Sequence, residues 1–381
     1  MGYSVIVIAV ILTALAFDFT NGFHDTANAM ATAIATGALK PRVAVVVAGV
    51  FNLVGAFLSV EVAKTISSGL VQESKVTPTV IFGGLIGAIL WNLGTWLVGL
   101  PSSSSHALFG GLIGATWVAA GSGAINFGTV ISKILLPAVL SPIIAGVVAL
   151  TATFLAYRIT ATSPHEPMRR GFRWAQVASA STVALAHGSN DGQKTMGIIT
   201  LTMITAGILP KGSNPPLWVI AACGLGIALG TCLGGWKIIQ TMGKKISDIE
   251  SPQGFAAETS SAVAILTSAH LGFALSTTHV CTGAIFGAGA GKRLASVKWG
   301  VARQMVTAWA LTLPAAACVG AVAGGVAERG QVGTIIVGLV GAGIAFAIFV
   351  ASRRNPVGAH NVNDVEDTTP TRVGDLAMSA A

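Results

Sequence analysis

Charged residues are scarce in this chain. Asp, Glu, Lys and Arg make up only 9% of its 381 residues, whereas apolar residues make up 53%. Soluble domains carry roughly 25% charged residues, so this composition excludes most cytosolic enzymes and nucleic-acid-binding proteins. The net charge of +8 fits basic loops beside a membrane better than a nucleic-acid surface. We therefore predict a multi-pass protein of the cell membrane, with the lipid bilayer as a partner and no nucleic acid.

Cysteines and catalytic motifs are also scarce. The cysteines show no paired spacing, which argues against a disulfide framework and against a structural metal site. No phosphate-binding P-loop occurs, so direct drive by ATP is not expected. An intramembrane hydrolase is a weak alternative, because no His-Glu-x-x-His pattern supplies a metal-activated nucleophile. We predict a protein that is not an enzyme and needs no resident cofactor or metal.

Long apolar runs dominate what is present. As helices, runs of this length can cross a hydrocarbon core about 30 Å thick. They predict an all-α integral membrane protein with about 10–12 transmembrane segments. Helices are expected at 3–20, 24–39, 42–60, 78–99, 103–120, 128–157, 175–187, 191–208, 216–240, 255–273, 276–290, 298–325 and 331–351.

Four short stretches of polar residues and glycine separate adjacent apolar runs, at 17–25, 100–105, 186–191 and 274–279. We predict broken helices or the tips of re-entrant hairpins there. Backbone that is not helical is tolerated at membrane depth only against protein or a water-filled cavity. The four stretches therefore predict a cavity beside them.

Two of these stretches recur, in the same order, in the second half of the chain. Asn21-Gly-Phe-His-Asp-Thr-Ala-Asn is matched by His187-Gly-Ser-Asn-Asp-Gly-Gln-Lys, so Asp25 corresponds to Asp191. Pro101-Ser-Ser-Ser-Ser-His is matched by Ala274-Leu-Ser-Thr-Thr-His. Two matched pairs in the same order predict an internal duplication.

A polar segment between the two copies is predicted to be a cytoplasmic linker. With this segment inside the cell, the loop of Lys40 is inside and its counterpart near Lys211 is outside. Matched loops on opposite sides predict an inverted-topology repeat. The predicted organisation is a first repeat (1–157), the linker (158–173), a second repeat (174–326), an additional transmembrane helix (327–351) and a polar, disordered cytoplasmic tail (352–381).

The two acids need an explanation, because a carboxylate at membrane depth costs roughly 2.5–3.5 kcal/mol on insertion scales. Residues of this kind mark substrate or ion paths. Three roles fit Asp25 and Asp191: coordination of Na⁺, carriage of protons, and acceptance of a hydrogen bond from a protonated phosphate oxygen. Phosphate offers such a proton at neutral pH and sulfate does not. A structural Asp that caps a broken helix is the remaining alternative.

Each hydroxyl-rich stretch precedes or begins a predicted helix. Helix N-termini present free N–H groups and about half a positive charge, which suits an oxyanion. Capping alone would also explain these hydroxyls, but their symmetric recurrence beside buried acids favours anion binding. The candidate phosphate-binding residues are Asp25, Asp191, Ser103, Ser104, Ser105, Ser276, Thr277 and Thr278.

The two copies differ in charge at one position, where Asn28 is replaced by Lys194. A fixed ammonium can fill the place of a bound monovalent cation, which favours H⁺ over Na⁺ as the coupling ion. A Na⁺ site near Asp25 and Asn28 is the alternative. The groups expected to take part in coupling are Asp25, Asn28, Asn21, His24, Asn190, Asp191, Lys194 and Glu258.

These paired motifs resemble the inorganic phosphate transporter (PiT) family over residues 5 to 350. The resemblance implies a secondary phosphate symporter with an inverted-repeat helical fold, assembled as a homodimer. His24 and Lys194 depart from the common family motif and look like the bacterial low-affinity branch. That branch is proton-coupled and carries neutral metal–phosphate complexes, so the resemblance implies phosphate accompanied by a divalent metal.

The prediction is a secondary active symporter that imports inorganic phosphate across the cytoplasmic membrane, coupled to H⁺ in preference to Na⁺. The alternatives are a transporter of the same fold for sulfate or another tetrahedral oxyanion, and a passive anion channel. Access is expected to alternate by rocking of one set of repeat helices about a fixed site.

Overall fold

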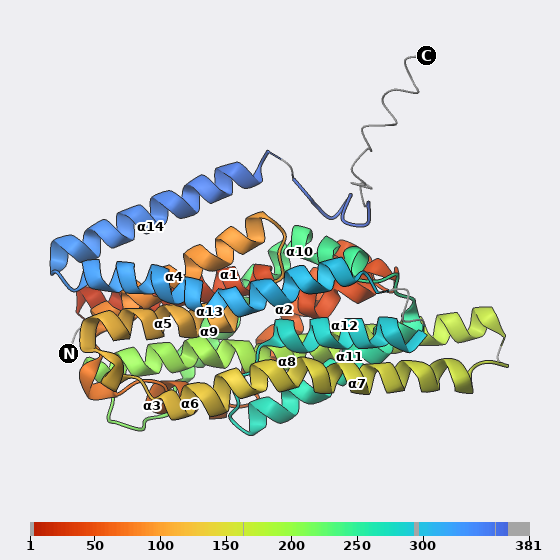
Figure 1. Cartoon of the computed structure of the whole chain (residues 1–381), viewed down its shortest axis with the longest axis horizontal. Coiled ribbons are helices and arrows are strands. Elements are labelled where there is room, and N and C mark those ends of the chain that lie inside the picture. The colour runs from red at the N-terminus through yellow and green to blue at the C-terminus, as the bar shows by residue number, and fades with distance from the viewer. Residues whose placement is uncertain (1–3, 163, 293–296, 355, 365–381) are drawn as a thin grey trace, which may run out of the picture.

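Helices make up nearly all the regular structure. The computed structural model describes residues 4–162, 164–292, 297–354 and 356–364, and within them the only strand-like pairings are two isolated bridges (Figure 1). The first half holds α1 (Val5–Ala35), α2 (Pro41–Gly55), α3 (Glu61–Gly69), η1 (Glu73–Lys75), α4 (Pro78–Leu97), α5 (Ser104–Ala120), η2 (Ser122–Ala124), α6 (Phe127–Thr129), η3 (Val130–Leu135) and α7 (Leu136–Ile159). The second half holds α8 (His165–Thr205), α9 (Leu217–Leu233), α10 (Trp236–Gln240), η4 (Thr241–Lys245), α11 (Ser251–His270), α12 (Thr277–Lys292) and α13 (Trp299–Ala327), and α14 (Gln331–Ser352) follows.

Several of these helices can span a membrane. Among the described residues, five helical segments are long and apolar enough, namely α1, α4, Phe127–Ile159, α13 and α14. A sixth is the bent pair formed by α9 and Trp236–Lys245. The predicted all-helical, multi-pass fold is confirmed. The count of 10–12 segments remains a prediction, because α8 and α11 are too polar, and α5 and α12 too short, to count as spans on length and composition alone.

Helices of the two halves pack in matched pairs. α1 packs on α9 as its counterpart α8 packs on α2, and α5 packs on α13 as α12 packs on α7. The first helices of the two halves run antiparallel, because Asp18 of α1 contacts Thr195 late in α8 and Thr36 contacts Gln176 early in α8. The halves are therefore related by inversion, as predicted. The last long helix of each half packs on the hairpin helices of the other half, which interlocks the two.

The predicted breaks at 17–25 and 186–191 are wrong. α1 and α8 continue without interruption through both stretches. Their glycines serve close helix crossings instead: a Cβ on Gly22 would collide with the Ile227 carbonyl of α9, and a Cβ on Gly188 with the Asn52 carbonyl of α2. The predicted interruptions at 100–105 and 274–279 are confirmed, because they connect α4 to α5 and α11 to α12.

A further break, which the sequence reading missed, lies within the predicted helix 216–240. α9 ends at Leu233, and the chain turns by 65° before Trp236–Lys245. Gly234 at the turn has φ of 73°, in the left-handed region that glycine adopts without steric cost. This bend is the broken helix of the second half.

The predicted linker 158–173 is mostly helical. α7 ends at Ile159 and α8 already begins at His165, since the ring of Pro167 is tolerated in a first helical turn. Glu166 and Arg169 then form an ion pair at 3.1 Å on the exposed face of that helix. The irregular connection is therefore much shorter than the polar composition suggests.

Part of the predicted tail packs on the bundle. Among residues 356–364, Val362 is buried, and Gln240 Nε2 donates a hydrogen bond to the Asp364 carbonyl at 2.6 Å. Residues 365–381 of the predicted disordered tail lie outside the described residues.

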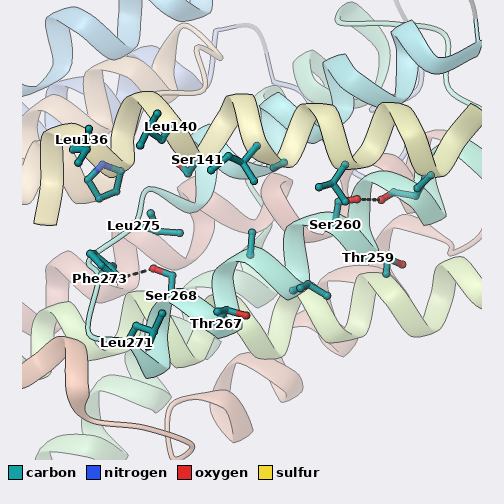
Figure 2. Close-up of a pocket in the computed structure, with 18 of the residues that line it drawn as sticks. Leu136, Leu140, Ser141, Thr259, Ser260, Thr267, Ser268, Leu271, Phe273 and Leu275 are labelled. Atoms are coloured by element: carbon teal, nitrogen blue, oxygen red, sulfur yellow. Dashed lines mark hydrogen bonds between the residues drawn. The ribbon is translucent and has the colours of Figure 1, made fainter. Parts of the chain in front are cut away.

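α14 covers one flank of the first half, where it lies on α4 and α13 (Figure 1). The corresponding groove of the second half, between α11 and α7, holds no helix of the described chain. It forms an apolar cavity of about 650 Å³ lined by Leu136 and Leu140 of α7, Thr259 of α11, and Leu275 of the α11–α12 hairpin (Figure 2). The two flanks thus differ although the helices beneath them correspond.

Candidate functional site

Asp25 lies buried near the middle of α1, and both of its oxygens have partners. His24 Nδ1 lies 2.6 Å from Asp25 Oδ1, and the Ser104 hydroxyl donates to Asp25 Oδ2 at 2.6 Å. Ser104 is the first residue of α5, so the hairpin between α4 and α5 delivers this donor. The first acid and the first hydroxyl-rich stretch therefore meet, as the sequence predicts.

Asp191 repeats this arrangement on α8. Thr277, the first residue of α12, donates its hydroxyl to Asp191 Oδ2 at 3.1 Å, and Asn190 Nδ2 donates to Oδ1 at 2.8 Å. Lys194, one turn along α8, forms a direct ion pair with Asp191 Oδ1. Asp191 thus has the same kind of hydroxyl donor as Asp25, but its remaining partners include a full positive charge.

Contacts across the two halves join these clusters. Asn28 on α1 donates from Nδ2 to the hydroxyl oxygens of Thr277 at 3.3 Å and Thr278 at 3.1 Å. The Lys194 ammonium donates to the Ser105 hydroxyl at 2.5 Å and to the Leu275 carbonyl at 2.8 Å. Asn28 and Lys194 occupy the same position of the repeated motif. Each of them therefore contacts the hydroxyl-rich stretch of the other half.

His187 lies between the two acids. Its Nε2 is 3.3 Å from Asp191 Oδ2 and 3.9 Å from Asp25 Oδ2, and one atom from each of the three groups lies within 4.8 Å of the others. Its Nδ1 pairs with the Asn52 amide oxygen at 3.0 Å. Because imidazole both donates and accepts protons, this position links the acids chemically. From the sequence, His187 was quoted only as part of the repeated motif, and Asn52, which no motif marks, was missed.

The outer hydroxyls of the two stretches cap the hairpin helices. Ser103 Oγ accepts a hydrogen bond from the backbone N–H of His106 at 3.2 Å, and Ser276 Oγ accepts one from His279 at 3.2 Å. The rings of these two histidines meet edge to face, with centroids 4.7 Å apart. The starts of α5 and α12 therefore face a common region, and the hydroxyl hydrogens of both serines are not consumed by capping.

Two predicted site residues lie outside this network. Glu258 of α11 is buried and accepts hydrogen bonds from Thr32 and Ser179 at 2.5 Å each and from Gln176 at 3.2 Å. Thr32 is about two helical turns from Asp25 along α1. Asn21 is buried, and its Oδ1 has no hydrogen-bond partner within the described ranges. The structure therefore separates Glu258 from the central cluster, and among the described residues Asn21 makes no side-chain hydrogen bond to either Asp.

The central cluster combines fixed donors and fixed acceptors. Hydroxyls and an ammonium can bind the oxygens of a tetrahedral anion, and carboxylates can accept its protons. Each hydroxyl that donates to a carboxylate here can turn to an entering anion. The arrangement is suited to a protonated oxyanion.

Comparison with known proteins is consistent with this site. The sequence profile described as "Phosphate transporter family" matches residues 21–320. A protein of Mycobacterium bovis named probable low-affinity inorganic phosphate transporter is 52% identical over 361 residues, which cover 94% of this chain and 87% of that protein. A Bacillus subtilis protein with the same name is 43% identical over 321 residues, covering 84% of this chain and 96% of that protein. A solved structure titled "The sodium-dependent phosphate transporter" matches with a TM-score of 0.75 and 26% identity over 84% of this chain and 98% of that chain.

Proposed function

Because the chain belongs to the phosphate transporter family, we propose that it is a secondary active symporter that imports inorganic phosphate across the cell membrane. H⁺ is the favoured coupling ion, and Na⁺ is the alternative. The observation that carries the proposal is the buried network in which Asp25, Asp191 and Lys194 meet hydroxyls from both halves. Such a network is unusual at membrane depth unless it lies on a substrate path.

Phosphate would bind through both hydroxyl-rich stretches. Ser104, Ser105 and Thr277 would donate to its oxygens in place of their present acceptors. Thr278, whose hydroxyl oxygen now accepts from Asn28, would donate its own hydroxyl hydrogen. Ser103 and Ser276 would add the donors at the starts of α5 and α12. A protonated phosphate oxygen would in turn donate to Asp25 or Asp191. Sulfate lacks that proton at neutral pH, so the acids favour phosphate over the sulfate alternative.

Coupling to H⁺ is supported by the position of Lys194. Its ammonium already neutralises Asp191, whereas a Na⁺-coupled site would need a mobile cation there. The imidazoles of His24 and His187 contact the acids and can both donate and accept protons. Asn28 and Asn190 would orient Thr277, Thr278 and Asp191. Glu258 would serve as a second proton-carrying acid on the Thr32 side. A divalent metal carried with phosphate would be cargo.

Access to the site would alternate between the two membrane faces. α7 and α13 each pack on the hairpin helices of the opposite half. Rocking these helices against α1 and α8 would open one hairpin while closing the other. We also propose a homodimer, which native mass spectrometry of the detergent-solubilised protein would test directly.

The test uses purified protein in proteoliposomes with imposed gradients of H⁺ or Na⁺, one at a time. We expect uphill phosphate accumulation with an acidic exterior and none with Na⁺ alone. Excess sulfate should compete weakly, and more weakly as the pH rises. Accumulation driven only by Na⁺ would reverse the coupling ion, equal competition by sulfate would favour the broader oxyanion transporter, and purely downhill flux would indicate the channel.

A further inference from the structure

One buried acid takes no part in the site described above. Asp18 lies on α1 about two helical turns before Asp25, and its side chain is 0% exposed. Thr195 of α8 donates its hydroxyl to Asp18 Oδ1 at 2.6 Å. Asp18 Oδ2 has no hydrogen-bond partner among the described residues. The carboxyl therefore has one hydroxyl donor and, from Cys223, at most the weak S–H donor of a thiol.

The groups that face Asp18 leave it without a neutralising charge nearby. From α9, the Cys223 thiol faces the carboxyl, and the backbone of Gly226 approaches so closely that an added Cβ would lie 3.3 Å from the Asp18 Cβ. From α8, Thr195 contacts it, while Asp191 and His187 act on it at longer range. Asp18 forms no ion pair with any residue that the structure describes.

An ionised carboxylate in such a place would be costly. Burial of a charge without a partner is strongly unfavourable, and one hydroxyl does not replace the lost hydration. The neutral acid avoids this cost, and its O–H group fits the geometry, since Oδ2 is free to carry the proton. We propose that Asp18 is a proton-binding site of the transporter, which holds a coupling proton outside the central cluster.

The position of Asp18 gives this proton a direction. Thr195 is about one turn from Asp191 on α8, so the Asp18–Thr195 contact lies directly beside the central cluster. Thr32, which donates to Glu258, lies about two turns from Asp25 on the opposite side. With segment 158–173 in the cytoplasm, Asp18 is the acid nearer the outer solution. Buried acids then lie at three depths between the outer solution and the cytoplasm: Asp18, the Asp25–Asp191 pair, and Glu258.

The transfer step balances simply. The O–H bond of neutral Asp18 breaks, its proton passes to the His187 imidazole or to a carboxylate of the central cluster, and Asp18 regains H⁺ from the outer solution. No other reactant is needed. This inference rests on the proposed H⁺ coupling.

The test compares Asp18→Asn, which keeps the shape of the neutral acid, with Asp248→Asn at an exposed acid. In proteoliposomes with the membrane potential clamped, one fewer proton per phosphate lowers the limiting accumulation ratio by about tenfold for each pH unit of gradient. We expect this loss in Asp18→Asn with phosphate–phosphate exchange retained, and no loss in Asp248→Asn. Unchanged accumulation in Asp18→Asn, or loss of exchange in the folded variant, would overturn the assignment.

Infrared difference spectroscopy gives a readout that does not depend on transport. The protein should show carbonyl bands of protonated carboxyls that shift in D₂O. The component of Asp18 should persist in Asp248→Asn and disappear in Asp18→Asn, while any component of Glu258 remains. Persistence of the full band in Asp18→Asn would overturn the proposal. If the unsubstituted protein accumulates phosphate with Na⁺ alone, the proposed coupling ion fails, while the band still decides whether Asp18 holds a proton.

Discussion

The two halves build the same site with different charge. On α1, Asp25 is held by a histidine and a serine hydroxyl, and Asn28 extends only an amide to the opposite hairpin. On α8, Asp191 is held by a threonine hydroxyl, an amide and the ammonium of Lys194. The scaffold is therefore symmetric, but its electrostatics are not. The second half carries its own ammonium counterion, whereas Asp25 has only imidazoles and a hydroxyl around it. Under the proposed function, the charge of Asp25 would be balanced by what binds.

Removal of either acid should have the largest effect on transport, and only removal of Asp191 should also lower the stability of the protein. We expect Asp25→Asn and Asp191→Asn each to lower phosphate uptake by about 100-fold or more, since loss of one partner in a buried charged network costs several kcal/mol. Asp191→Asn should also lower the free energy of unfolding by about 3 kcal/mol, because Lys194 is left as an unpaired buried charge. Asp25→Asn should not.

Uptake into proteoliposomes and thermal unfolding in detergent measure the two effects, with Asp248→Asn as the exposed control. Near-normal uptake in either variant would remove that acid from the site. Equal stability losses in both variants would show that the Asp191–Lys194 ion pair adds nothing to the stability of the second half.

Lys194→Asn makes the second half resemble the first. We expect H⁺-driven uptake to fall by about tenfold and a stimulation by Na⁺ to appear, because a mobile cation would then have to neutralise Asp191. Uptake under separate H⁺ and Na⁺ gradients measures the change. Lys211→Asn, which removes an ammonium from an exposed surface, should leave both dependences unaltered. An ion dependence that does not change in Lys194→Asn would contradict the role of the ammonium.

Substitutions at the matched helix crossings test whether the packing of the two halves is symmetric, independently of their charges. Gly22→Ala and Gly188→Ala each push a Cβ into a backbone carbonyl of the crossing helix, so each should lower the free energy of unfolding by about 1–3 kcal/mol. Gly94→Ala is the control, because nothing lies within 4 Å of the added Cβ. It should be neutral or stabilise α4. Thermal unfolding in detergent distinguishes these outcomes, and a tolerated Gly22→Ala would argue against the close crossing.

The smallest effect is expected at the helix caps. Ser103→Ala and Ser276→Ala should each cost about 1 kcal/mol of stability by removing a capping oxygen, whereas Ser103→Thr should retain the cap. If these serines also donate to phosphate, the apparent KM for phosphate should rise in both alanine variants. A stability loss with unchanged KM would limit both serines to capping.

The sequence predicted the partners of the site better than the path of the chain. The repeated motifs indicated that Asp25 and Asp191 would approach hydroxyls at the starts of two later helices, and Ser104 and Thr277 are those donors. The breaks around Gly22 and Gly188 were wrong, because a glycine beside polar residues looks the same in sequence whether it ends a helix or admits a neighbour. Only the crossing helix distinguishes the two.

Other features of the structure depend mainly on contacts between helices that are distant in the sequence. An apolar pattern marks α7 and α13 as membrane helices, but it does not say that each packs on the opposite half. Asn52 stands in an ordinary apolar helix, whereas Asp18 lies in the stretch 17–25 that was predicted to be a break; for both, the importance depends on which helix faces them. The bend at Gly234 coincides with the Gly234–Gly235 pair, a turn signal that the predicted helix over 216–240 did not take into account.

The unequal flanks have a consequence for how the bilayer meets the protein. On one side, α14 packs on α4 and α13 and covers part of their surface. On the other side, the cavity between α7 and α11 reaches Leu275, whose carbonyl accepts a hydrogen bond from the Lys194 ammonium. Acyl chains that enter this cavity would contact the hairpin that holds Lys194, whereas α14 covers α4 in the other half.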